Sequence, residues 1–378
     1  MSSIAAAGNH TSPARRVALL EPGRLGRYDL PTRVLMAPMT RMRAHPNGVP
    51  SEMMVTYYAQ RATAALIISE ATAVSAQGVG YGNAPGLYTG EHVSGWTTIT
   101  AAVHQRGGRI FVQLFHAGRI SHPLLQPQNS PPVAPSAVRP DGTVRTPEGA
   151  LPFETPRPLH RDELAGVVAE FTRAAEFAIA AGFDGVEIHA ANGYLLDQFL
   201  RSRTNLRHDD YGGSPQNRAR LLVEVASSVA SVIGADRTGV RLSPLHGFND
   251  ISDAAPAVTF GTAVASLNGL GLAYLHVVER DDAPLAGPRF EIASLRQLWK
   301  SAYIANESYG RLRAEAALAA GADFVSFGRL FIANPDLPLR FETHALLNIP
   351  DRASFYGGDE RGYIDYPTLA GNSRVPSG

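Results

Sequence analysis

Three polar side chains gather at the end of one short apolar stretch and could act together on a substrate. The run 186–190 has the character of a strand buried on both faces, and it brings His189, Asn192 and Tyr194 to the point where such a strand would end. His189 and Asn192 can both donate hydrogen bonds to one substrate oxygen, and the Tyr194 hydroxyl can supply a proton to a neighbouring atom. A polarised oxygen beside an available proton is half of a reductase or isomerase site.

Each of these residues also has an ordinary structural explanation. A histidine at a strand end is commonly a satisfied structural residue, Asn-Gly is a common turn, and a tyrosine before two leucines is commonly part of a core. The functional hypothesis therefore depends on the combination of the three and on the elements that position them.

The amino-acid composition is typical of a globular protein and does not indicate a highly charged binding partner. Of its 378 residues, 44% are hydrophobic and 18% are charged, and its 34 basic residues balance its 34 acidic ones. This balance gives no net attraction to nucleic acid or to an anionic membrane, and no apolar run approaches the roughly 20 residues of a membrane helix. We expect a soluble, cytoplasmic protein, and the sequence leaves monomer and homodimer equally open.

Cysteine is absent, which excludes disulfides, thiolate nucleophiles, cysteine-ligated zinc and iron–sulfur clusters. We expect no metal site, so any redox chemistry must come from a bound organic cofactor. Residues 1–18, rich in alanine and serine, read as a flexible tail rather than a transit peptide, and 371–378 read as a second tail. The range 19–370 then forms a single domain.

Buried-type strands alternate with helices along this domain. Strands are predicted at 34–40, 66–72, 110–116, 186–190, 238–243, 273–278, 303–305 and 324–327, and the helices between them at 53–65, 91–106, 164–178, 215–233, 257–268, 292–299 and 309–320. Eight such units predict an α/β fold of the (β/α)₈ TIM-barrel class. A β-hairpin precedes the first strand, and the proline-rich range 117–160 after the third strand is expected to be a long loop that serves as a lid.

In such a barrel the carboxyl ends of all strands face one mouth, so the residues at these ends form one set. Gly328 and Arg329 follow the last strand, where barrels often bind phosphate. Gln113 and Arg241 would be costly in the mouth without partners, and a planar heterocycle with carbonyls and ring nitrogens would satisfy both. The alternative for Arg241 is an internal ion pair with Glu70 or Glu187.

Several longer motifs carry a resemblance to a known family. They are Ala37-Pro-Met-Thr-Arg41, His189-x-x-Asn-x-Tyr-Leu-Leu-x-Gln-Phe-Leu200, Asp210-Tyr-Gly-Gly-Ser-x-x-Asn-Arg218, Phe327-Gly-Arg329, Ala333-Asn-Pro-Asp-Leu337 and Gly362-Tyr-x-Asp-Tyr-Pro367. With them the chain resembles the Old Yellow Enzyme family of flavin-dependent ene-reductases, from about Leu20 to Leu369. The second and third motifs are highly specific, whereas Phe-Gly-Arg alone is not.

The resemblance implies non-covalent FMN at the barrel mouth, with NADPH or NADH as hydride donor. Hydride would pass through flavin N5 to the β-carbon of an α,β-unsaturated carbonyl compound. His189 and Asn192 would hold the carbonyl oxygen, and Tyr194 would protonate the α-carbon. The resemblance further implies that the flavin ring and its phosphate contact Pro38, Met39, Thr40, Ala71, Gln113, Arg241, Glu307, Ser308, Gly328 and Arg329, and that the substrate is flanked by Phe115, Tyr363 and Tyr81.

The chain departs from the family pattern after the seventh strand, where relatives usually carry glycine or other small residues. Here the chain reads Ala305-Asn-Glu-Ser-Tyr309, and a Glu307 carboxylate aimed at the flavin phosphate would repel it. We therefore expect the Glu307 side chain to point away if the backbone is to donate to the phosphate.

Two other functions fit parts of the same pattern. An isomerase or aldolase-type barrel would use the phosphate site for its substrate, but it would not need Thr40, Gln113 and Arg241 around a planar ring. A non-catalytic flavin- or ligand-binding protein would leave the set His189, Asn192 and Tyr194 without a role.

Overall fold

The computed structural model describes residues 18–280 and 290–369. The tails predicted at 1–18 and 371–378 lie outside these residues, apart from Ala18. Within the described part of the chain, no helix is both long enough and apolar enough to cross a membrane.

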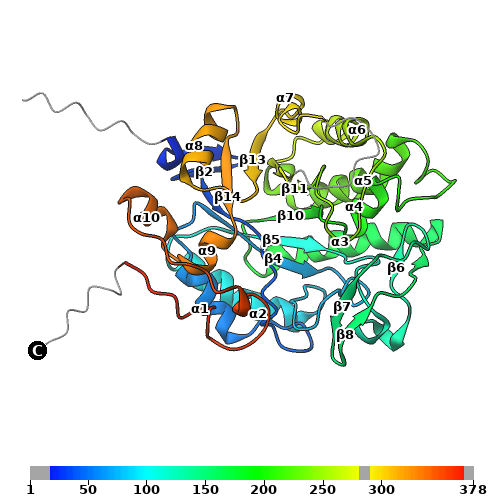
Figure 1. Ribbon diagram of the computed structural model, residues 1–378, viewed down its shortest axis with the longest axis horizontal. Helices are drawn as coiled ribbons and strands as arrows, with labels where there is room; N and C mark the ends of the chain where they lie inside the picture. The colour runs from blue at the N-terminus through cyan, green and yellow to red at the C-terminus, as the bar shows by residue number, and fades with distance from the viewer. Residues whose placement is uncertain (1–17, 281–289, 370–378) are drawn as a thin grey trace, which may run out of the picture.

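Eight parallel strands close into a barrel in the order β10-β11-β12-β13-β14-β3-β4-β5, which confirms the predicted (β/α)₈ fold. Helices surround these strands on the outside (Figure 1). Because side chains then cover both faces of the sheet, nearly every strand residue is buried. The strands are β3 Val34–Met36, β4 Leu66–Ala73, β5 Ile110–Phe115, β10 Gly185–Ala190, β11 Thr238–Leu242, β12 Tyr274–Val278, β13 Ala302–Asn306 and β14 Phe324–Phe327.

The helices between strands match the predicted positions to within a few residues, except that α1 ends five residues earlier than expected. Each buries an apolar stripe against the barrel; in the longest of them, a Ser214 cap and Pro215 set the start. These helices are α1 Glu52–Gln60, α2 Gly90–His104, α3 Leu164–Ala180, α5 Pro215–Ile233, α6 Pro256–Asn268, α7 Ser294–Leu298 and α8 Arg311–Ala319. Three short helices were not predicted: α4 Leu195–Leu200, α9 Arg329–Ala333 and α10 Leu337–Glu342.

The predicted N-terminal hairpin is present and closes one end of the barrel. It consists of β1 Gly23–Leu25 and β2 Tyr28–Leu30, paired antiparallel. Leu25 and Leu30 are buried in a cluster with residues from the amino ends of the strands, among them Leu66, Phe111 and Phe324. Because this end is filled with side chains, only the carboxyl end is left for a ligand.

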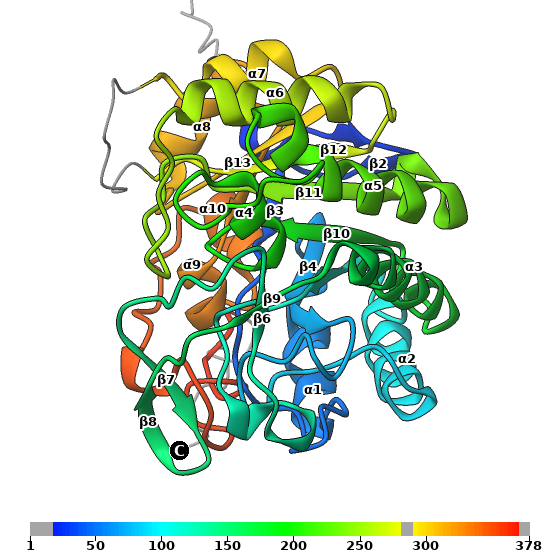
Figure 2. The same ribbon diagram turned by 90° about the vertical axis from the view of Figure 1, so that its right-hand side faces the viewer.

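The range 117–160 is more ordered than the predicted irregular loop. It contains the hairpin β7 Thr143–Thr146 and β8 Gly149–Pro152, together with the short parallel pair β6 Val133–Ala134 and β9 Arg157–Pro158. The hairpin projects from the body of the barrel (Figure 2). Its sequence gave little apolar signal because Val144 is the main side chain that it buries, against a cluster at the barrel mouth that includes Phe153 and Tyr194.

Candidate active site

A cavity of about 1120 Å³ opens at the carboxyl end of the barrel. Every one of the eight barrel strands contributes to its wall, either from its own end or from the loop that follows. The contributions in strand order are Pro38 to Met42 after β3, Ala71, Gln113, His189, Arg241, Arg280 after β12, Asn306 to Tyr309, and Ser326 to Leu330.

The end of β10 and the turn after it hold the three residues that could do chemistry, His189 in the strand and Asn192 and Tyr194 beyond it. Asn192 and Gly193 both adopt positive φ angles, 58° and 78°, which Asn and Gly tolerate best. A Cβ on Gly193 would lie 2.8 Å from the Asn249 Cβ, so only glycine fits there. The turn therefore presents the Asn192 and Tyr194 side chains to the cavity from adjoining positions.

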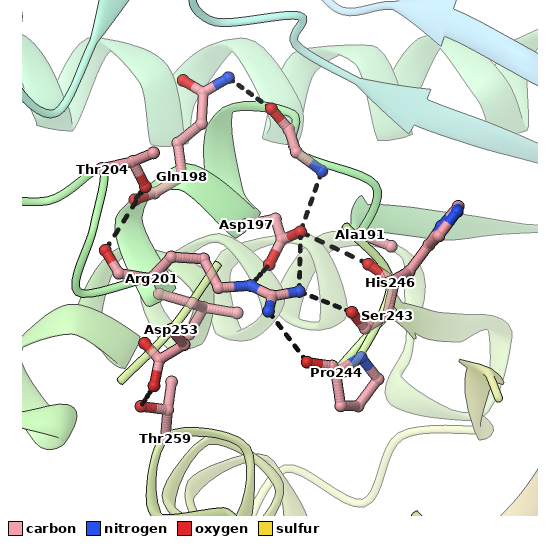
Figure 3. Close-up of polar contacts among 12 residues, drawn as sticks. Ala191, Asp197, Gln198, Arg201, Thr204, Ser243, Pro244, His246, Asp253 and Thr259 are labelled. Atoms are coloured by element: carbon pink, nitrogen blue, oxygen red, sulfur yellow. Dashed lines mark hydrogen bonds and ion pairs between the residues drawn. The ribbon is translucent and has the colours of Figure 1, made fainter. Parts of the chain in front are cut away.

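A buried ion pair supports this turn from below. The Asp197 carboxylate accepts hydrogen bonds from the Gly193 backbone N–H (2.9 Å) and from Arg201 Nε (2.7 Å). The Arg201 guanidinium also donates to the carbonyl oxygens of Ser243 and Pro244 (Figure 3). Both charged side chains are almost wholly buried, so each depends on the other for compensation.

Ser243, just after β11, links this pair to the turn. Its hydroxyl oxygen accepts a hydrogen bond from the Asn192 N–H at 2.7 Å and lies 3.4 Å from the Asp197 carboxylate. The backbone N–H groups of Asn192 and Gly193 are thus held by Ser243 and Asp197, whose side chains do not line the cavity. We did not predict this support, although Asp197 and Arg201, four apart among apolar residues, gave a signal for it.

The hydrogen bonds of His189 determine which nitrogen carries its proton. Its Nδ1 accepts from the Ala191 N–H at 3.3 Å, so a neutral ring must carry its proton on Nε2. Burial, with the charges of Arg241 and His276, holds the pKa of His189 well below its ordinary value of 6.5. The imidazole is therefore neutral near pH 7 and has its remaining donor at Nε2.

Asn192 and Tyr194 are each oriented by a neighbouring side chain. Asn192 Oδ1 lies 3.1 Å from His246 Nδ1, an arrangement that leaves the Asn192 amide hydrogens available. The hydroxyls of Tyr194 and Tyr81 are 2.9 Å apart. Burial, together with Tyr81, raises the pKa of Tyr194 well above its usual value of 10, so Tyr194 keeps its proton at neutral pH.

A polar chain runs through the barrel interior beneath the cavity. Glu187 accepts from Gln113 Nε2 at 2.7 Å and lies 2.7 Å from His276 Nδ1, while His276 Nε2 is 2.8 Å from the Ser326 hydroxyl. Burial alone would raise the pKa of Glu187, but His276, Arg241 and Gln113 lower it below its ordinary value. This series of hydrogen bonds fixes the Gln113 amide at the cavity wall.

Arg241 does not form the ion pair that was the alternative to a ligand contact. Its Nη2 donates to Asn306 Oδ1 at 2.7 Å, and no carboxylate among the described residues lies within 4 Å of its guanidinium. Its buried Nε has no hydrogen-bond partner in the described part of the chain. A buried donor without a partner at a cavity wall can bind a ligand that offers a hydrogen-bond acceptor, and the flavin ring of FMN offers several.

The ends of β13 and β14 are suited to the phosphate of such a cofactor. At Gly328 an added Cβ would lie 3.3 Å from the Met39 sulfur, so glycine keeps this backbone open to close approach. Arg329 Nη2 donates to the Ser308 hydroxyl at 2.6 Å, and Arg280 lies nearby at the end of β12. Glu307 lines the same part of the cavity, with one carboxylate oxygen 3.7 Å from Arg280 Nη1.

The structure brings most of the predicted site residues to this one cavity. They are Pro38, Met39, Thr40, Ala71, Tyr81, Gln113, His189, Asn192, Tyr194, Arg241, Glu307, Ser308, Gly328 and Arg329. Phe115 does not line the cavity; it is fully buried behind it, with its ring edge-to-face against Tyr194 at 5.2 Å.

Tyr363 is not brought to the cavity either. It is fully buried, and its ring stacks on Tyr57 of α1 at 4.2 Å, with the Arg41 and Arg43 guanidiniums over it. This packing ties the C-terminal segment to the barrel. The tyrosine of that segment that does line the cavity is Tyr356, which the sequence analysis missed.

Other cavity residues that were not predicted come from the loops above the barrel. The β7–β8 region contributes Val144, Arg145 and Phe153, and the loop after β11 contributes Phe248 and Asn249. The Asn249 amide donates to the Asn192 carbonyl at 2.8 Å. None of these residues belongs to a barrel strand, so the strand pattern from which the barrel was predicted gave no reason to select them.

Comparison with known proteins places the chain in one family. Residues 18–348 match the model of the NADH:flavin oxidoreductase / NADH oxidase family. The chain is 42% identical to putative 12-oxophytodienoate reductase 11 of Oryza sativa subsp. japonica, over 93% of this chain and 97% of that protein.

Solved structures show the same relationship in three dimensions. The Old Yellow Enzyme homologue of Zymomonas mobilis is 42% identical with a TM-score of 0.89, over 93% of this chain and 100% of that one. Morphinone reductase in complex with tetrahydroNAD is 45% identical with a TM-score of 0.89, over 95% and 99% of the two chains. The chain belongs to the NADH:flavin oxidoreductase / NADH oxidase family and is an FMN-dependent, nicotinamide-nucleotide-dependent oxidoreductase of the Old Yellow Enzyme type.

Proposed function

We propose that this protein is an ene-reductase, which reduces the carbon–carbon double bond of α,β-unsaturated carbonyl compounds. The observation that carries the proposal is the meeting of His189, Asn192 and Tyr194 on one wall of the cavity. The names of the relatives, reductases of 12-oxophytodienoate and of morphinone, agree with this reaction type. Bound FMN supplies the transfer of hydride from NADPH or NADH to the β-carbon of the substrate.

His189 and Asn192 bind the substrate carbonyl in this proposal. The His189 Nε2–H and the Asn192 amide are the donors left over once their internal hydrogen bonds are made. As the β-carbon receives hydride, negative charge develops on the carbonyl oxygen, and two preorganised donors stabilise it. Because His189 is neutral, the substrate oxygen receives a hydrogen bond and keeps its enolate character rather than taking a full proton.

Tyr194 completes the reaction by protonating the α-carbon. A phenol whose pKa is raised by burial still holds its proton at neutral pH and is available as a general acid. The Tyr81 hydroxyl, 2.9 Å from that of Tyr194, can return a proton afterwards. Tyr81 and Tyr356 bound the space in which the substrate lies.

The FMN contacts follow the wall of the cavity. We assign the ring to Pro38, Met39, Thr40, Ala71, Gln113 and Arg241, and the phosphate to Ser308, Gly328 and Arg329 with the neighbouring backbone. Support for the ring assignment comes from the unpaired Arg241 Nε and the fixed Gln113 amide. The β7–β8 hairpin serves as the lid and, through Val144, Arg145 and Phe153, limits which substrates fit.

The visible spectrum of the purified protein tests this function first. We expect flavin absorbance that bleaches on anaerobic addition of NADPH or NADH and returns on addition of 2-cyclohexenone. Return with the enone separates an ene-reductase from a barrel isomerase or aldolase, which needs no flavin, and from a flavin-binding protein without turnover. A bleached flavin that 2-cyclohexenone and other enones fail to reoxidise would contradict the proposal.

A further inference from the structure

The loop after β13 holds two side chains in backbone conformations that favour glycine. Glu307 has φ of 140° and Ser308 has φ of 48°. A side chain at such angles crowds its own backbone, and strain of this kind persists at ligand sites where the surroundings hold it. A glutamate at this position is therefore unfavourable for the local backbone, and its carboxylate lies in the cavity wall.

The Glu307 carboxylate occupies contacts that an anionic ligand would otherwise use. It accepts a hydrogen bond from the Ser308 hydroxyl at 2.8 Å and lies 3.7 Å from Arg280. Arg329 in turn donates to the same Ser308 hydroxyl at 2.6 Å. Three side chains suited to phosphate, from the ends of three adjacent strands, are thus joined through one protein carboxylate.

The ring end of the cavity does not share this feature. There Gln113 donates to Glu187 inside the barrel, and Arg241 donates to Asn306, the residue before Glu307. A flavin with a phosphate and a flavin without one would meet the same groups there. The charge of Glu307 reaches Arg241, where it opposes the burial that lowers the pKa of that guanidinium. Its direct contacts are Ser308 and Arg280, so it acts mainly on the part of the cofactor that distinguishes FMN from riboflavin.

We propose that Glu307 is a specificity-determining residue of the flavin site that lowers its preference for FMN over riboflavin. The proposal rests on the proposed function, in which the flavin phosphate lies between the ends of β13 and β14. A carboxylate that holds Ser308 and Arg280 repels the phosphate and competes for its donors. Riboflavin has no phosphate and escapes both effects.

Flavin titrations of the full-length protein, after removal of any bound flavin, test the proposal. Dissociation constants for FMN and riboflavin are measured by fluorescence quenching for the wild type and for Glu307→Gln, which removes the charge and keeps the size. We expect Glu307→Gln to tighten FMN binding by roughly tenfold at low salt and to leave riboflavin binding unchanged. The gain should shrink as salt screens the partly exposed loop.

Two further variants separate charge from backbone strain. Glu307→Gly removes both, so we expect the gain for FMN together with a higher melting temperature of the flavin-free protein. Glu315→Gln is the matched control: it removes a carboxylate from α8, where Glu315 pairs with Arg311 outside the cavity, and should leave both affinities unchanged.

The outcomes are distinct. Equal changes for FMN and riboflavin, or weaker FMN binding in Glu307→Gln, would overturn the inference, since the carboxylate would then act on the whole loop or support the phosphate site. If the wild type binds neither FMN nor riboflavin, the proposed function fails along with the inference.

Discussion

The two ends of the cavity are built in opposite ways. At the substrate end, the turn that carries Asn192 and Tyr194 rests on the buried pair Asp197 and Arg201, and its positive φ angles fall on Asn and Gly. At the proposed phosphate end, positive φ angles fall on Glu307, which is half-buried, and on Ser308, which is exposed. The two ends thus differ in their support, which is buried at the proposed substrate end and more exposed at the proposed phosphate end.

The largest effect is expected when the buried ion pair that supports the substrate end is removed. Asp197→Asn leaves Arg201 as a buried, uncompensated charge, so we expect the free energy of unfolding to fall by about 3–5 kcal/mol. Urea denaturation measures the change. Asp210→Asn, which removes an exposed partner of Arg161, should leave the unfolding midpoint unchanged. Similar losses in the two variants would show that the buried pair has no special part in holding the turn.

Tyr194→Phe tests the chemistry of the same end. We expect the anaerobic rate of flavin reoxidation by an enone to fall by roughly 10²- to 10⁴-fold, the usual contribution of a general acid, while flavin reduction by NADPH or NADH is unaffected. Stopped-flow absorbance follows each half-reaction separately. An equal loss in both would remove Tyr194 from the role of proton donor.

The pH dependence of the wild type sharpens this assignment. A tyrosine loses its proton on the alkaline side of its pKa, and the pKa of Tyr194 is raised well above its usual value. The enone half-reaction should therefore show no alkaline decline from Tyr194 up to about pH 10. A decline centred well below that pH, absent in Tyr194→Phe, would contradict the raised pKa.

His189→Ala removes one of two donors to the substrate oxygen, so we expect the affinity for phenolic ligands and for enones to fall roughly tenfold or more.

A histidine gains its charge on the acid side of its pKa, and the pKa of His189 is lowered well below 6.5. Ligand affinity in the wild type should accordingly show no step from His189 between about pH 6 and 8. Titration of the flavin absorbance with a phenol measures both effects, and unchanged affinity in the variant would count against the role.

Arg329→Gln addresses the phosphate end. Loss of the guanidinium should weaken FMN by roughly tenfold and leave riboflavin unaffected, because charge-assisted contacts to phosphate are the stronger ones. Fluorescence quenching with both flavins is the measurement. If riboflavin weakens as much as FMN, then Arg329 supports the loop rather than the phosphate.

The smallest effect is expected at the cavity rim. Tyr356→Ala removes a wall of the substrate space and should raise KM for enones a few-fold with little change in kcat. Tyr363→Phe is its matched control, since the buried Tyr363 hydroxyl has no partner among the described residues and the ring packing is kept. Steady-state kinetics compare the two, and a larger change in Tyr363→Phe would place that residue, not Tyr356, at the substrate.

The prediction from sequence was accurate where the signal is local. The buried strands and the helix caps follow from short-range periodicity, so the barrel and its eight strand ends could be derived. Once the ends are known to share a mouth, residues as distant as Thr40 and Arg329 fall into one site.

The two misplaced site residues, Phe115 and Tyr363, were wrong because their positions depend on contacts between distant segments. Nothing in the segment 355–363 shows which tyrosine faces the cavity; Tyr363 is turned inward because Tyr57 and Arg41, some three hundred residues away, pack against it. The β7–β8 hairpin was missed because it buries too little apolar surface to produce a clear alternation. The backbone angles of Glu307 likewise appear only in the folded loop.

The sequence by itself determined the class of fold and the family, and it selected the residues that we propose to react, because strand periodicity and the motif at the end of β10 lie in consecutive residues. Only the tertiary structure decided the protonated nitrogen of His189, the support of the turn after β10 by Asp197 and Arg201, and the position of the Glu307 carboxylate. These depend on burial and on hydrogen bonds between groups that meet only when the barrel closes.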